Sequence, residues 1–164
     1  TPTYLVGLLK RNHYDLGRMA NEETNSDVLN SIYGDDQPIP VIFQSGYLTI
    51  KGYDKRFDLY RLGFPNKEVE EGFIKFLMLF YTRFNKIEAP FEIQQFTREI
   101  EMGQPDAFFK RLRSFFADTP YEVATDLERY YQNVLFIVFK LVGFYTETEY
   151  CTACLLYTSD AADE

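Results

Sequence analysis

The chain has 164 residues, enough for one domain with a buried core but few for two full domains. Its hydrophobic content of 46%, with 16 Phe and 13 Tyr, excludes an intrinsically disordered chain. The formal net charge of −8 argues against a nucleic-acid surface over most of the chain but leaves room for a local basic patch. The longest apolar run, 134–139, is far short of the roughly 20 residues of a membrane span, so we expect a soluble, cytoplasmic protein with no membrane partner.

The first forty-five residues predict two short helices separated by a polar loop. Thr1 and Pro2 can serve as N-cap and first helical residue, and apolar residues recur at helical spacing up to Asn12. Residues 21–37 are polar, which favours a loop with one helical turn at about 27–32. Pro38 and Pro40 then begin a second helix, which ends at Ser45-Gly46.

A β-hairpin is predicted next, because 47–51 and 57–62 alternate at period two around 52–56. Four cations on it could contact phosphates as the wing of a winged helix does: Lys51, Lys55, Arg56 and Arg61. Asp54 and Asp58 offset half of that charge. The same pattern is typical of a solvated strand edge that resists aggregation, and the sequence leaves both readings open.

Four helices are predicted after the hairpin. Asn66 caps the first, whose apolar stripe runs over 69–84. The second covers 90–102 and ends at Gly103, and Asp106 caps the third, which runs to about 116. The fourth, from about 126 to 142, is apolar nearly all round after Asn133 and should be buried at the centre of the molecule.

The last helix should end at Gly143, and the alternation over 144–152 predicts a strand. Together these patterns predict a mainly α protein of the α+β class. A winged-helix-like N-terminal part with one β-hairpin is followed by a helical bundle and a truncated terminal strand.

No complete catalytic, metal or cofactor site is visible in the residues. The phosphate-binding pattern G-x-x-x-x-G-K-[ST] does not occur, and no nucleophile is paired with a base and an orienting group. Glu147 and Glu149 share a face of the predicted terminal strand, where carboxylates bind a divalent ion only if further ligands converge on them.

The chain ends in CTACLLYTSDAADE, which raises the question of a C-x-x-C metal or redox pair at Cys151 and Cys154. Residues 154–164, CLLYTSDAADE, match the translation of a transposon-library sequencing adapter codon by codon. We therefore expect 154–164 to be an adapter-derived tail and the C-x-x-C spacing to be accidental.

Five segments, in order, resemble a bacterial family in which an AAA-ATPase-like domain precedes a PD-(D/E)XK nuclease-like domain. They are TPTYLVGLLKRNHYDL, PIPVIFQSGYLTIKGYD, LYRLGFPNKEVEEGF, DAFFKRLRSFFADTPYE and ERYYQNVLFIVFKLVGFYTETEY. The resemblance implies that 1–65 is the winged-helix-like lid that ends the ATPase-like domain. It implies further that 66–120 is a helical connector and that 121–153 opens the nuclease-like domain.

The resemblance also implies a functional assignment. The chain would be a non-catalytic fragment, whereas the parent protein would bind ATP and Mg²⁺ and could act as an ATPase and a Mg²⁺-dependent nuclease. Glu128 and Glu149 would be outlying acidic members of the nuclease site, and the partners would be the ATPase core and nuclease sheet of the same chain. The alternative hypothesis is a winged-helix module that binds nucleic acid or protein through the 47–62 hairpin.

Overall fold

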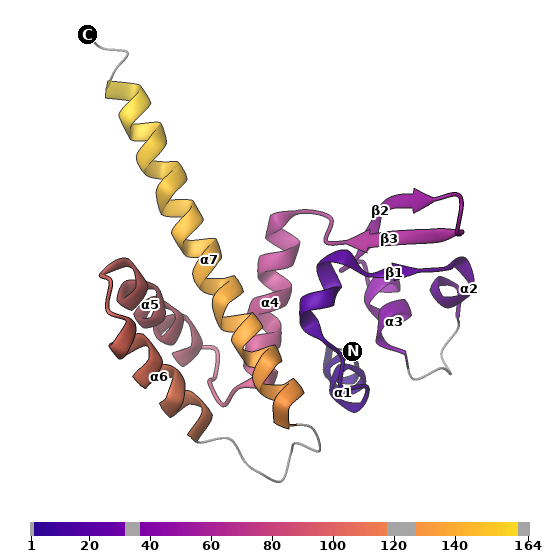
Figure 1. Ribbon diagram of the computed structural model, residues 1–164, viewed down its shortest axis with the longest axis horizontal. Helices are drawn as coiled ribbons and strands as arrows, with labels where there is room; N and C mark the ends of the chain where they lie inside the picture. Colours follow the sequence, from indigo (N-terminus) through magenta and orange to yellow (C-terminus); the bar gives the residue numbers. More distant parts are fainter. Residues whose placement is uncertain (1, 32–36, 118–126, 161–164) are drawn as a thin grey trace.

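The computed structural model describes residues 2–31, 37–117 and 127–160, with side chains as far as Thr146. Figure 1 shows a mainly helical molecule with one small sheet, which confirms the predicted class. In chain order the elements are α1 (Pro2–Arg11), η1 (Leu16–Asn21), β1 (Glu23–Thr24), α2 (Ser26–Leu29), α3 (Pro38–Gln44), β2 (Thr49–Asp54), β3 (Leu59–Gly63), α4 (Lys67–Tyr81), α5 (Glu88–Glu101), α6 (Pro105–Ala117) and α7 (Leu127–Asp160).

The N-terminal part has the winged-helix arrangement that the sequence predicts. Its sheet is antiparallel with strand order β1-β3-β2, so the β2–β3 hairpin returns to pair with the short strand between the helices. The helices α1 and α3 end close to their predicted boundaries, and Gly46, two residues after α3, takes φ 80°, a conformation that glycine adopts without strain. The predicted cap Thr1 and part of the predicted turn at 27–32 lie outside the described residues.

The turn of the hairpin lies at 55–58, so the predicted turn over 52–56 is wrong by about three residues. The Asp54 carboxylate accepts hydrogen bonds from the backbone N–H groups of Arg56 (2.9 Å) and Phe57 (3.3 Å), and Asp58 takes φ 53°. Aspartate favours turns through such side-chain bonds and tolerates the left-handed conformation. Gly52 lies instead within β2, next to a register shift that interrupts the pairing between Ile50 and Gly52.

Two short elements were not predicted, η1 and β1. Asp15 caps η1 by accepting a hydrogen bond from Gly17 N at 3.0 Å, and Leu16 and Met19 bury this segment in the core. Strand β1 has two residues and is fixed by its pairing with β3. Neither element is long enough to show a hydrophobic period, so only tertiary contacts define it.

The first three helices of the bundle follow the sequence closely. Asn66 caps α4, as predicted, by accepting a hydrogen bond from Val69 N at 2.8 Å. Asp106 lies inside the first turn of α6, whose first residue is Pro105, so the predicted cap is displaced by a residue or two. Proline suits the first helical position because its missing N–H has no partner there in any case.

Helix α7 passes through Gly143 and continues to Asp160, so the predicted helix end and the predicted strand at 144–152 are both wrong. A strand needs a neighbouring strand to pair its backbone groups, whereas a continued helix pairs them internally. One glycine costs a helix only about 1 kcal/mol relative to alanine. Thr146 Oγ1 bonds back to Val142 O at 3.1 Å, in the helical pattern. The predicted start near 126 lies outside the described residues.

The middle of α7 is the centre of the bundle, as predicted. It packs against α4 and α5, and Val134, Ile137 and Val138 are fully buried. Figure 1 shows its C-terminal half extending past the ends of α4 and α5. Phe139, in contrast, is 50% exposed, so one face of this apolar helix is uncovered by the described residues.

One buried amide joins the winged part to the bundle. Asn133 on α7 is 3% exposed, accepts a hydrogen bond from Leu16 N at 3.0 Å and donates one to Tyr14 O at 2.8 Å. Arg129, one turn earlier, pairs with Asp15 at 3.1 Å. The side chain of Asn133 therefore satisfies two backbone groups of the segment that leads into η1.

Replacing Asn133 with Ala should lower the free energy of unfolding by about 2–4 kcal/mol, because each buried backbone group left unpaired costs about 1–3 kcal/mol. Urea unfolding followed by far-UV circular dichroism measures this loss. The matched control is Gln132→Ala, an exposed neighbour whose loss should stay within about 0.5 kcal/mol. Equal effects for the two variants would contradict the anchoring role of Asn133.

Candidate functional site

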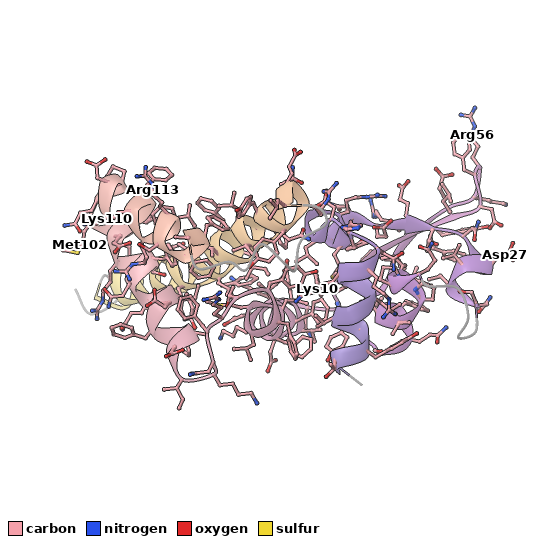
Figure 2. The ribbon with its side chains drawn as sticks, turned by 90° about the horizontal axis from the view of Figure 1, so that it is seen from below. Lys10, Asp27, Arg56, Met102, Lys110 and Arg113 are labelled. Carbon is pink, nitrogen blue, oxygen red and sulfur yellow. The ribbon has the colours of Figure 1, made fainter. Side chains whose placement is uncertain are left out.

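The β2–β3 hairpin (49–63, the wing) carries all four predicted cations at exposed positions. Lys55 and Arg56 lie together in the turn, and Figure 2 shows Arg56 at the far end of the wing, pointing away from the helices. Lys51 is directed toward the base, where its Nζ donates to Pro65 O at 3.1 Å. The Arg61 guanidinium lies across Gly52, 3.1 Å from where a Cβ would be. The structure therefore brings two of the four cations together at the tip.

Aromatic side chains accompany the cations of the wing. Tyr53 is 52% and Phe57 62% exposed, and the Arg56 guanidinium lies over the Phe57 ring at 5.0 Å. Tyr53 OH donates to Asp58 Oδ1 at 2.7 Å, and this hydrogen bond raises the pKa of Tyr53. Both aspartates are thus engaged locally, one by backbone N–H groups and the other by a phenol. A tip of this kind can contact a phosphate, a base or an acidic protein surface.

Helix α3, which precedes the wing, lacks the polar and basic side chains of a DNA-recognition helix. In helix-turn-helix proteins that bind DNA, the recognition helix presents polar side chains to the groove. Here α3 has the sequence PIPVIFQ with no Lys or Arg, and Pro38, Ile39, Pro40 and Ile42 are buried. Gln44 donates its amide hydrogens to Leu29 O at 3.2 Å and to Ser31 O at 3.4 Å. The α3 surface therefore cannot neutralise phosphates, and its one amide side chain is already engaged.

The two acidic candidates do not form a joint site. Glu128 lies exposed in the first turn of α7 and accepts a hydrogen bond from Gln132 Nε2 at 3.2 Å. Glu149 lies on the same helix about six turns later, ~30 Å away at the usual helical rise. Among the described residues no group of three or more His, Cys, Asp or Glu side chains could hold a metal ion. These two carboxylates do not fit a shared Mg²⁺ site.

The structure reveals a second feature, a cavity of about 470 Å³ formed by the α4–α5 loop, α5, α6 and α7. Arg111 lies in its wall, with Nε 2.8 Å from Glu99 Oε1 and Nη1 3.3 Å from Glu92 Oε2. The hydrogen bond that Arg111 donates to the Glu99 carboxylate is the main cause that raises the pKa of Arg111. Glu99 is 9% exposed, and its Oε2 atom is buried without a partner among the described residues.

The helical spacing of Ile93, Phe96 and Ile100 predicts that these three residues form the buried face of α5, and for this reason the sequence does not reveal the cavity. Ile100 is in fact 42% exposed, whereas Glu99 is buried. The available signal was the spacing of Glu92 and Glu99, which places two carboxylates on one helical face, together with a cation in the apolar stripe of α6. That signal identifies a pair only once α5 and α6 are known to pack together.

No helix in the described part of the chain is both long and apolar enough to cross a membrane. Compared with models of protein families, with curated proteins and with solved structures, the chain shows no match.

Replacing Arg111 with Ala should lower the free energy of unfolding by about 2–3 kcal/mol, because it leaves the buried Glu99 carboxylate without its cation. The loss falls below that of a fully buried pair because the Arg111 side chain is 29% exposed. Thermal or urea denaturation measures it. Arg113→Ala, on the exposed side of the same helix, is the control and should change stability by less than about 0.5 kcal/mol. An unchanged free energy of unfolding in Arg111→Ala would show that the two ion pairs do not contribute to stability.

Proposed function

We propose that this chain forms the winged lid, the helical connector and the start of the PD-(D/E)XK nuclease-like domain of an AAA-ATPase-like protein. In this proposal the residues of the chain position other parts of the protein and catalyse nothing themselves. The observation that carries it is the apolar character of α3. A winged helix whose recognition helix is buried and uncharged suits contacts within a protein better than contacts with DNA.

The joint between the two parts supports a mechanical role. Lys10 Nζ at the end of α1 donates to Phe80 O at the end of α4 at 2.7 Å, and Asn133 binds the backbone before η1. Lys140 on α7 pairs with Glu70 on α4 at 2.9 Å. The first two contacts join the winged part to α4 and α7, and the third joins α4 to α7. A movement of the lid would therefore be carried to the connector rather than absorbed between them.

An exposed aromatic surface supports the proposed partner. Phe109 of α6 is 60% exposed and Phe139 of α7 is 50% exposed. Buried Phe108 lies between them, with ring centroids 5.6 Å from Phe109 and 5.7 Å from Phe139. An apolar face of this kind suits the nuclease-like sheet of the same protein, while ATP and Mg²⁺ would be held outside the residues of this chain.

The alternative function is nucleic-acid or protein binding through the wing. It is favoured by one observation, the presence of Lys55, Arg56 and exposed Phe57 side by side at the tip. The two proposals differ in what happens when the isolated chain meets a DNA duplex.

Fluorescence anisotropy with a labelled duplex should detect no salt-sensitive binding by the chain between about 50 and 200 mM salt. If the four wing cations each neutralised a phosphate, the logarithm of affinity would fall with that of salt with a slope of about −3 to −4. Lys55→Glu combined with Arg56→Glu would then abolish binding. The matched control is Lys110→Glu with Arg113→Glu, at the other end of the molecule in Figure 2. Salt-sensitive binding lost only in the wing variant would favour the alternative.

The family assignment has its own test in the genomic reading frame that contains these residues. The proposal expects G-x-x-x-x-G-K-[ST] upstream of the lid, because the ATPase core needs a phosphate-binding loop. It expects G-R-x-D and then E-x-K downstream, where carboxylates would hold Mg²⁺ and the lysine would steady the attacking water. A frame that carries neither motif would refute the assignment.

A further inference from the structure

The cavity beside Arg111 has the size and composition of a ligand site. Its volume of about 470 Å³ falls within the range of about 300–1,000 Å³ typical of small-molecule pockets. One wall carries Phe84 and Phe115, whose ring centroids are 4.9 Å apart. The polar groups fall into two sets, the carboxylates of Glu92 and Glu99 and the cations of Arg83, Lys110 and Arg111.

The buried carboxylate of Glu99 indicates which group a ligand of this cavity should carry. Arg111 bonds only to Oε1, through Nε and Nη2, both at 2.8 Å, and Oε2 has no partner among the described residues. An unpaired buried acceptor is costly, so a donor that reaches it is favoured. Glu99 lines the cavity, so Oε2 is the acceptor that a ligand in the cavity can satisfy while Oε1 stays bonded to Arg111.

Arg83 and Lys110 define a second property of a suitable ligand, its charge. Arg83 and Lys110 line the cavity and are exposed, and with Arg111 they outnumber the two carboxylates. A ligand that carried only positive charge would be disfavoured by this excess. An anionic substituent, in contrast, could lie against Arg83 or Lys110 while a neutral N–H donor faces Glu99.

We propose that this cavity binds an aromatic amine that carries an anionic substituent. The ring packs against Phe84 and Phe115, the amino group donates to Glu99, and the anionic group pairs with Arg83 and Lys110. Arg111 acts as a positioning residue, because it fixes the Glu99 carboxylate through Oε1. This inference does not depend on the proposed lid role, since every group involved belongs to α5, α6 and the α4–α5 loop.

The test uses small matched ligands and saturation-transfer NMR on the full chain. The probes are 4-aminobenzoate and the longer 3-(4-aminophenyl)propionate, each compared with the same acid lacking the amino group and with aniline, which lacks the acid. We expect at least one of the two amino-substituted carboxylates to bind about tenfold more tightly than both of its comparison compounds. A tenfold difference in affinity corresponds to about one buried hydrogen bond to a charged group. If neither 4-aminobenzoate nor 3-(4-aminophenyl)propionate shows this preference, the proposal is wrong. This comparison uses the unmodified chain and needs no variant.

Variants separate the two halves of the site. Glu99→Gln should remove the preference for the amino group while leaving the preference over aniline. Arg83→Gln with Lys110→Gln should do the reverse. Arg113→Gln, exposed on α6, is the control and should change neither. If Glu99→Gln folds, as judged by circular dichroism, and still prefers the amino probe tenfold, the assigned role of Glu99 is wrong.

Discussion

The side chain of Asn133 fixes how the two halves of this molecule meet. Its helix is apolar on most sides, and an apolar helix by itself packs in several rotations of similar energy. A buried amide has one good orientation, in which it accepts from Leu16 N and donates to Tyr14 O. Any rotation or slide of α7 would leave these groups unpaired, so the hydrogen bonds select one register, much as a buried asparagine does in a coiled coil.

That register also determines the rest of the bundle. Tyr130 lies one turn before Asn133; its hydroxyl donates to Tyr81 O at 2.7 Å, and its side chain contributes to the Arg111 cavity. Ile137, one turn after Asn133, is fully buried, and Phe139 is turned outward. The same constraint therefore sets the contact with the winged part, one wall of the cavity and the exposed aromatic surface.

Local signals predicted the elements that are defined locally. Capping residues and hydrophobic periodicity were sufficient to predict helices α1, α3 and α4. Asn66 caps α4, as its position indicated. The turn of the wing depends on two aspartates rather than on Gly52, and α7 runs through Gly143 because a continued helix pairs its backbone groups internally. At the candidate sites, the sequence named the wing cations but could not pair Arg111 with Glu99, which requires the packing of α5 on α6.

The arrangement of charge explains why an acidic chain with local basic groups does not form a basic stripe. Figure 2 shows Arg56 at one end of the molecule and Lys110 and Arg113 at the other. Proteins that follow a nucleic-acid backbone place their cations along one face, so that successive phosphates are neutralised together. Here the α3 surface beside the wing is uncharged, and Arg111 is held by two carboxylates. Arg56 at one end and Lys110 with Arg113 at the other suit separate contacts with acidic or anionic groups, and this favours a part that positions its neighbours over one that binds a duplex.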